Sequence, residues 1–467
     1  MHSSSDQPPA RGPGLPAQAL FEPESIAVVG VPRSPRPGQL FLRALLDPGY
    51  AGRIYPVNPN AQEILGLRCY PSVNSLPEVV DLAIVVVSPS LAPSVVRECS
   101  EKGVKAAILF TAGFSELGTE EGRKRGDELM AAVRSGQLRM VGPNCMGVYV
   151  PKSGLGSFPG MSSEQGPIAF VSQSGSLSNR LVWSGAERAL AFSKVVSVGN
   201  QDDLEASDFL EYLAEDPETG IVAAYVEGAM DGRRLWRALT AVGRRKHLVV
   251  WKVGRTGSGA RAAHSHTGAL AGETAVWSGM LRQAGAIQVR DLDELLDILV
   301  ALRHLGRPTG KRMAIVTGPG GPAVSASDAC EEAGLELADL ADETRTRLRG
   351  VVASTGTSVR NPVDIGLQLA QAAEMYRDAL AATIRDPGVD AVVVIGSSSQ
   401  GEGWQEHVEA MGELARNAAK PILYVSFIAN DPSVAQALAA QSIASFSSAE
   451  RALQAYARVR EAGPRRG

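Results

Sequence analysis

From Ser25 onward, short β-branched runs alternate with amphipathic helical segments, and this alternation constrains the fold more than any other feature. It predicts an α/β architecture in which helices cover both faces of parallel sheets. The chain has 467 residues, which predicts about three domains of roughly 150 residues each. We expect these domains at 19–150, 151–305 and 311–467, after a disordered N-terminal lead over 1–18.

Composition and charge exclude several classes of partner. The net charge is -4 and only 5% of the residues are aromatic, which argues against nucleic acid and anionic membranes as partners. The four cysteines form no CxxC pair and no Cys/His cluster, so we expect no metal site and no disulfide framework. A reducing, cytoplasmic location fits this pattern. No apolar run reaches the roughly 18 residues of a membrane span.

Each predicted strand of the first region ends in a turn or a polar residue. These strands are Ser25–Val29, Arg53–Val57, Leu82–Val87, Ala106–Phe110 and Met140–Val141. Ligands of parallel sheets bind outside the carboxyl ends of the strands, so we expect the turns to converge on one crevice. The first turn is not a complete G-x-G-x-x-G, and Asn58 stands where a dinucleotide site needs an acidic residue. Both points argue against NAD and leave coenzyme A open, with ordinary turn chemistry as the alternative reading of the glycines.

The second region contains a strand, a serine-rich turn and a helix start. Pro167–Val171 is the predicted strand, and Ser172–Ser178 follows it. The N–H groups at such a helix start suit a phosphate, although an ordinary serine N-cap explains the same pattern.

Two further predicted strands of this region are followed by residues that suggest a catalytic role. Ile221–Val226 is followed by Glu227, whose carboxylate is able to orient an imidazole or to cap a neighbouring helix. Leu248–Val253 leads into a segment of small residues that contains His264 and His266. Gly and Ala let such a loop move, and neutral imidazole is a nucleophile near pH 7, so the loop is typical of a phosphoryl carrier. A solvated histidine is the alternative.

The third region supplies strands at Met313–Val316, Ala391–Ile395 and Pro421–Val425. Gly318 to Gly321 follow the first of them, and tight-turn packing explains these glycines better than anion binding. No strong chemical constellation is predicted in this region.

Five motifs make the chain resemble the NDP-forming acyl-CoA synthetase family, which includes ADP-forming acetate–CoA ligase and is related to succinyl-CoA synthetase. They are Tyr55-Pro56-Val57-Asn58-Pro59, Gly142-Pro143-Asn144, Val171-Ser172-Gln173-Ser174-Gly175, Ser265–Gly272 and Asn361-Pro362-Val363-Asp364. The second and fourth are the most specific, and the resemblance spans about Leu20 to Ala457. It implies a Rossmann-like CoA-binding domain followed by two flavodoxin-like, succinyl-CoA-synthetase-like domains.

The resemblance also implies a ping-pong reaction. Acyl-CoA and phosphate give a bound acyl phosphate and CoA, a histidine takes the phosphoryl group, and the phosphoryl group passes to ADP. By match to the motif, His266 looks like the phosphorylated nucleophile, and Glu227 is similar in placement to the glutamate that orients it. His264 stands where the family has a small residue. Phosphate binding is implied for Ser174, Gly175 and Ser176.

Coenzyme A binding is implied for the turns of the first domain. The residues are Gly30, Ser34, Asn58, Ser88, Pro89, Ala112, Gly113, Asn144 and Met146. The first turn departs from the family in being rich in proline. The family's ATP-grasp portion is missing after the third region. We therefore expect an ATP-grasp β-type partner subunit that carries Mg²⁺ and ADP or ATP, with phosphate, a small carboxylic acid and its acyl-CoA as the other ligands.

Two other function classes compete with this hypothesis. A non-enzymatic CoA- or acyl-CoA-binding sensor or scaffold would keep the fold without phosphorylation, and the intact histidine loop and phosphate turn argue against it. A nicotinamide-dependent oxidoreductase is disfavoured by the first turn and by Asn58.

Overall fold

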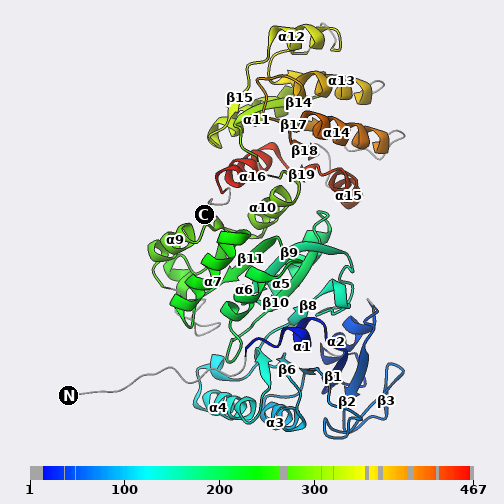
Figure 1. Ribbon diagram of the computed structural model, residues 1–467, viewed down its shortest axis with the longest axis vertical. Coiled ribbons are helices and arrows are strands. Elements are labelled where there is room, and N and C mark those ends of the chain that lie inside the picture. The colour runs from blue at the N-terminus through cyan, green and yellow to red at the C-terminus, as the bar shows by residue number, and fades with distance from the viewer. Residues whose placement is uncertain are drawn as a thin grey trace, which may run out of the picture. The chain divides into compact units, whose positions relative to one another are not determined.

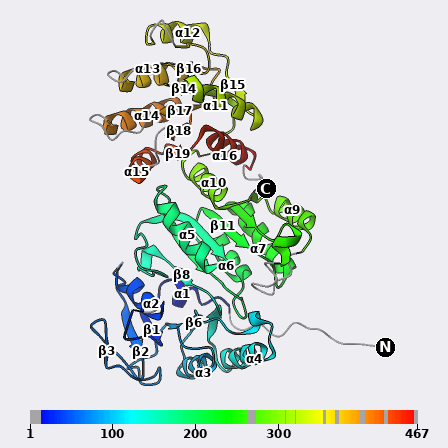
Figure 2. The same ribbon diagram turned by 180° about the vertical axis from the view of Figure 1, so that it is seen from behind.

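The structure, a computed structural model, describes residues 14–35, 37–47, 49–261, 272–306, 308–318, 320–352, 357–366, 372–396, 404–426 and 431–462. The chain divides into two compact units (Figures 1 and 2). The first unit is Met1–Val182 with Phe192–Ala284, and the second is Trp183–Ala191 with Gly285–Gly467. Within the described ranges no helix is both long and apolar enough to cross a lipid bilayer. The predicted domain limits themselves stay predictions.

The first sheet of the first unit is parallel, with strand order β2-β1-β5-β6-β7. Its strands are β1 (Ser25–Val29), β2 (Arg53–Val57), β5 (Leu82–Val85), β6 (Ala106–Leu109) and β7 (Arg139–Val141), with a small hairpin of β3 (Glu63–Ile64) and β4 (Leu67–Arg68) beside β2. The helices are α1 (Ala17–Phe21), α2 (Pro37–Leu46), α3 (Ala92–Lys102) and α4 (Glu120–Arg134), and a 3-10 turn, η1, spans Ser115–Leu117. The strand order reverses at β1, so a ligand crevice is expected between the ends of β1 and β5.

Strand β5 is two residues shorter than predicted, and the chain that follows it passes close to Gly30 at the end of β1. The φ angle of Gly30 is 92°, a conformation that favours glycine. A Cβ atom at this position would lie 2.7 Å from Cγ1 of Val87. The chain after Val85 therefore passes too close to the first turn for any other residue to replace this glycine without strain.

The second sheet of this unit follows the order β12-β11-β9-β10-β8, and only β8 is antiparallel to its neighbour. Its strands are β8 (Gly147–Tyr149), β9 (Gln165–Ser172), β10 (Phe192–Ser197), β11 (Ile221–Val226) and β12 (His247–Lys252). The helices are α5 (Gly175–Ala186), α6 (Ala206–Glu215), α7 (Gly232–Arg245) and α9 (Thr274–Gln283), and η2 spans Pro151–Ser153.

Sequence analysis did not predict β10, because Lys194 interrupts its apolar run. Every residue of this strand is buried. The Lys194 ammonium lies 2.9 Å from a carboxylate oxygen of Asp216 and 2.7 Å from one of Glu218. A buried charge is tolerated only when it is paired, and here the pairing lets a lysine occupy a core strand.

The second unit holds a parallel sheet of order β15-β14-β17-β18-β19, with β16 paired to β14. Its strands are β14 (Arg312–Thr317), β15 (Glu336–Leu337), β16 (Val363–Asp364), β17 (Ala391–Gly396), β18 (Ile422–Ser426) and β19 (Ala444–Phe446), while β13 (Ile287–Val289) precedes α10. The helices are α10 (Leu292–His304), α11 (Gly320–Glu332), α12 (Asp342–Arg349), α13 (Ala372–Ile384), α14 (Trp404–Ala418), α15 (Pro432–Ala440) and α16 (Ala449–Glu461). Helices α13 and α14 lie on one face of this sheet, and α11 and α16 on the other (Figures 1 and 2). The predicted α/β architecture of helix-covered parallel sheets is confirmed.

Candidate active site

A cavity of about 320 Å³ lies in the first unit, where loops from the carboxyl ends of both sheets meet. It is lined from the end of β6, the turn after β7, the start of α5 and the turn after β10. The lining residues are Phe110, Ala112, Asn144, Cys145, Met146, Gln173, Ser174, Gly175, Ser176, Gly199 and Asn200. None of these side chains is charged, so the lining offers amides, hydroxyls and backbone groups to a ligand.

The start of α5 forms one wall of this cavity. Strand β9 ends at Ser172, whose hydroxyl donates to the Ser174 carbonyl at 2.8 Å and accepts from the Ser174 N–H at 3.1 Å. The first N–H groups of a helix have no acceptor within the helix, and the positive end of the helix dipole lies with them. A Cβ atom at Gly175 would lie 2.6 Å from Cγ of Met146. The three predicted phosphate-binding residues therefore lie directly against the turn that carries Met146.

The predicted CoA-binding residues divide into two groups. Ala112, Asn144 and Met146 line the cavity. The others are not among its lining and follow the ends of β1, β2, β5 and β6; they are Gly30, Ser34, Asn58, Ser88, Pro89 and Gly113.

Two contacts join turns of the second group in pairs. The Asn58 amide donates to the Val31 carbonyl at 2.7 Å, which connects the turns after β1 and β2. A Cβ atom on Gly113 would lie 2.8 Å from Cγ of Pro89, so the turns after β5 and β6 touch. Ser34 is exposed. The role of the whole set in CoA binding stays a prediction.

Glu227 lies directly behind the cavity wall and is 4% exposed. The side-chain oxygen of Gln173, which lines the cavity, accepts from the N–H groups of Glu227 and Gly228. The Gln173 amide also donates to the Gly228 carbonyl at 2.8 Å. Burial, then the Glu227 charge, raises the pKa of Tyr225, so its hydroxyl remains a donor to the Glu227 carboxylate. Three hydrogen bonds from one amide therefore fix the turn that carries Glu227.

His264 and His266 lie outside the described residues, so the structure does not test their predicted roles. Strand β12, which leads toward them, is the hydrogen-bonded neighbour of β11, and Lys252 stands opposite Val226. The segment that contains both histidines therefore leaves the sheet from the strand next to Glu227.

Asn200 is a cavity residue that sequence analysis missed. Its amide donates to the Glu116 carboxylate at 2.6 Å, and its oxygen accepts from the Asn144 amide at 3.3 Å. Glu116 also accepts from the N–H of Gly113 at 2.5 Å. These contacts join the two sheets across the cavity. Because β10 was not predicted, its polar carboxyl end gave no signal.

Two titratable groups near the cavity have displaced pKa values. Burial raises the pKa of the Cys145 thiol to about 12, so this cavity-lining cysteine is no nucleophile at neutral pH. Burial, and next the charge of Glu116, raises the pKa of Asp202 to about 6. Asp202, two residues after Asn200, is therefore mostly ionised at neutral pH, and its burial makes this charge energetically costly.

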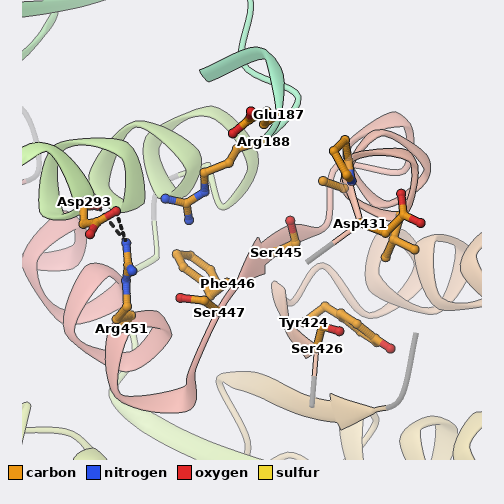
Figure 3. A pocket seen from close by; sticks show the side chains of 13 residues that line it. Glu187, Arg188, Asp293, Tyr424, Ser426, Asp431, Ser445, Phe446, Ser447 and Arg451 are labelled. Atoms are coloured by element: carbon orange, nitrogen blue, oxygen red, sulfur yellow. Dashed lines mark hydrogen bonds and ion pairs between the residues drawn. The ribbon is translucent and has the colours of Figure 1, made fainter. Parts of the chain in front are cut away.

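A second cavity, of about 430 Å³, lies in the second unit (Figure 3). Its lining residues are Glu187, Arg188, Asp293, Tyr424, Ser426, Asp431, Pro432, Val434, Ala435, Ser445, Phe446, Ser447 and Arg451. Both arginines contact the buried carboxylate of Asp297, Arg188 at 2.6 Å and Arg451 at 2.5 Å. Figure 3 shows Arg451 turned toward Asp293 as well. Three lining carboxylates and two paired guanidinium groups make this cavity unsuitable for phosphate.

Three family models match the chain. They describe a CoA binding domain at residues 24–151, a succinyl-CoA ligase like flavodoxin domain at 165–302 and a ligase-CoA domain at 313–400. Together the three models cover most of the chain, and residues of the CoA binding and succinyl-CoA ligase like domains line the first cavity.

Curated relatives and a solved structure agree with these models. The alpha subunit of acetate–CoA ligase [ADP-forming] II of Pyrococcus furiosus is 36% identical over 408 residues, which cover 86% of this chain and 88% of that subunit. Acetate–CoA ligase [ADP-forming] I of Archaeoglobus fulgidus is 40% identical over 381 residues, and the match covers 81% of this chain and 54% of that relative. This chain thus spans about half the length of the Archaeoglobus relative.

The solved structure is acetyl-coenzyme A synthetase 1 of Ca. Korarchaeum cryptofilum in complex with phosphate and ADP. It superposes with a TM-score of 0.81 at 32% identity, and the match covers 96% of this chain and 98% of that chain. The similarity extends over almost the full length of both chains. Motifs, fold and comparisons agree, and the chain belongs to the family of ADP-forming acetate–CoA ligases.

Proposed function

We propose that this chain is the α-type subunit of an ADP-forming acid–CoA ligase that works through an acyl phosphate and a phosphohistidine. One observation carries the proposal. An uncharged cavity joins the turns of the first sheet to the start of α5, with Glu227 held directly behind it by Gln173. The strand that leads to His266 is the neighbour of the strand that carries Glu227.

The first half-reaction fits this arrangement. An oxygen of phosphate attacks the thioester carbonyl carbon, the C–S bond breaks, and the CoA thiolate leaves and takes up a proton. The N–H groups at the start of α5 hold the phosphate charge, with a helix-end contribution of about 0.3–1 kcal/mol. A site without charged side chains avoids repulsion between its lining and the anionic phosphate.

The second step transfers the phosphoryl group to the chain. An imidazole nitrogen of His266 attacks phosphorus, the bond between phosphorus and the acyl oxygen breaks, and the carboxylate leaves. The Glu227 carboxylate accepts the other imidazole N–H, which keeps the attacking nitrogen unprotonated. Splitting one exchange into two transfers is nucleophilic catalysis. ADP then takes the phosphoryl group from the histidine.

In this proposal the nucleotide site, with ADP and Mg²⁺, belongs to an ATP-grasp β-type partner subunit. The alpha-subunit name of the Pyrococcus relative supports a partner chain. Across the described residues, no group of three or more His, Cys, Asp or Glu side chains is placed to hold a metal ion. A reducing cytoplasm suits the four cysteines, which are buried and unpaired.

The test is phosphorylation of the purified chain. We expect labelled phosphate and one member of an acyl-CoA panel (acetyl, isobutyryl, phenylacetyl and succinyl) to leave acid-labile, base-stable label on the protein. His266→Ala should abolish this label, and His264→Ala should keep it. Loss of label only in His264→Ala would overturn the site assignment. CoA binding without label from any acyl-CoA, also after addition of an ATP-grasp chain, would favour a sensor or scaffold.

A further inference from the structure

Lys252, the last residue of β12, has a buried side chain that turns into the protein. It is 6% exposed. Its ammonium donates to the Glu227 carbonyl at 2.8 Å and to the Val253 carbonyl. It also lies 4.8 Å from the ring centroid of Trp277 in α9. Two carbonyl oxygens and an aromatic face thus surround an ammonium group, which has three N–H donors.

The partners of Lys252 belong to three separate parts of the first unit. Glu227 follows β11, Val253 begins the segment that leaves β12, and Trp277 lies where the chain has returned in α9. A second contact joins the same two ends, because the Thr274 hydroxyl donates to the Arg255 carbonyl at 2.9 Å. The described ends of the histidine segment are therefore joined to each other and to the turn of Glu227.

Gln173 and Lys252 hold the Glu227 turn from opposite sides of β11. Gln173 binds the main chain of Glu227 and Gly228 from β9, the strand on one side. Lys252 binds the Glu227 carbonyl from β12, the strand on the other side. Of the two, Lys252 alone adds a positive charge beside Glu227.

We propose that Lys252 is a positioning residue for phosphohistidine formation, because its ammonium holds the Glu227 turn against both ends of the histidine segment. This inference rests on the proposed function. Lys252 has its donors turned to protein groups and touches no reacting atom in this assignment. Its effect reaches the reaction through the position of the Glu227 turn.

The inference has a consequence for pH dependence. Burial lowers the pKa of Lys252 to about 8, the Glu227 charge opposes this change, and Arg255 adds to it. Tyr225, the other titratable group at Glu227, has a pKa raised above its ordinary value and stays protonated in this range. Above pH 8 the neutral amine keeps two N–H donors and loses its charge. Phosphohistidine formation should therefore fall above pH 8.

The contribution of Lys252 to folding stability should instead rise as the pH increases above 8. The folded pKa of Lys252 is below its ordinary value of 10.5, so the unfolded chain binds more protons between pH 8 and 10.5. The contribution of this residue to folding stability then rises with pH. A loss of rate without a loss of stability separates positioning from simple structural support.

The experiment measures the pH profile of labelling from pH 6.5 to 9.5, with labelled phosphate and the acyl-CoA that labels the wild-type chain best. For Lys252→Met we expect a labelling rate at least about 10-fold lower than wild type at pH 7.5, with no further decline above pH 8. Lys252→Arg should keep a substantial rate and lose the decline above pH 8, because a guanidinium group stays charged there.

Lys246, at the opposite end of strand β12 from Lys252, provides a matched control. Lys246 precedes β12, its ammonium donates to the Leu213 and Asp216 carbonyls, and burial lowers its pKa as well. Lys246→Met should keep the wild-type pH profile. Thermal unfolding and CoA binding of every variant check its fold, and if Lys252→Met does not fold, the profile of Lys252→Arg decides.

Three results would contradict the inference. If the labelling rate of Lys252→Arg declines above pH 8 as it does in the wild-type chain, the pH argument is wrong. If folded Lys252→Met labels at the wild-type rate, Lys252 has no positioning role. The same change in Lys246→Met as in Lys252→Met would show a general effect of buried lysines. Absence of label on the wild-type chain at every pH would instead reject the proposed function, and the inference with it.

Discussion

The cavity of the first unit is lined by amides, hydroxyls and a helix start, whereas the cavity of the second unit is lined by two arginines and three carboxylates. Both lie at loops that follow strands of parallel sheets. In the second unit Asp297 already pairs with both arginines, so their charge is used within the fold. In the first unit the buried carboxylate behind the cavity wall belongs to Glu227, which we propose acts on the imidazole of His266. The phosphate site that we propose here would therefore depend on backbone groups more than on arginine.

The largest effect that tests this contrast is expected for Glu227→Gln. The amide is a weaker acceptor and carries no charge, so the imidazolium that develops during phosphoryl transfer loses its partner. We expect the labelling rate to fall by about 100-fold or more. The measurement is initial labelling with phosphate and the preferred acyl-CoA. Glu187→Gln, in the lining of the second cavity, is the matched control and should label at the wild-type rate.

A smaller effect concerns the pH dependence of folding stability. One buried group in each unit is expected to change stability with pH, and the two changes have opposite signs. The folded pKa of Asp202 is raised from its ordinary 3.8 to about 6, so stability falls as pH rises through this range. Asp202→Asn should therefore stabilise the chain at pH 7.5 by up to about 2 kcal/mol and give no gain near pH 4. Urea unfolding at both pH values measures the difference. An equal gain at both values would reject the electrostatic explanation.

His304 provides the counterpart in the second unit. Its ring nitrogens have no hydrogen-bond partner among the described residues, and burial, then the Arg303 charge, lowers its pKa to about 4. Stability from this residue is present above pH 6.5 and falls as pH decreases toward 4. A His304→Gln chain should lose less stability than wild type between pH 7 and pH 5. Equal losses in both chains would contradict this sign.

The smallest effect compares glycines at two helix starts. A Cβ atom at Gly175 meets Met146 at 2.6 Å, whereas a Cβ atom at Gly321 in α11 meets no atom within 4 Å. Gly175→Ala should cost about 1 kcal/mol of stability and weaken phosphate use several-fold, because the helix start moves. Gly321→Ala should be neutral or stabilising by up to about 1 kcal/mol. Thermal unfolding and the phosphate concentration dependence of labelling test both variants.

Much of the site was predictable from local sequence. The serine turn after β9 and Glu227 after β11 occupy strand ends, and a strand end can be recognised from an apolar run followed by polar residues. Asn200 was missed for a physical reason, since Lys194 makes its strand look polar. The pairing of that lysine with Asp216 exists only after two distant segments have come together.

The sequence by itself determined the alternation of strands and helices, the membership of the family and the positions of the motifs, because apolar periodicity and short motifs are local properties of the chain. Only the tertiary structure decided which strand ends share a cavity, that Gln173 holds the Glu227 turn, and that Lys252 reaches across to it. Strand order within a sheet decides those neighbours. It depends on packing between segments far apart in the sequence, which no local pattern records.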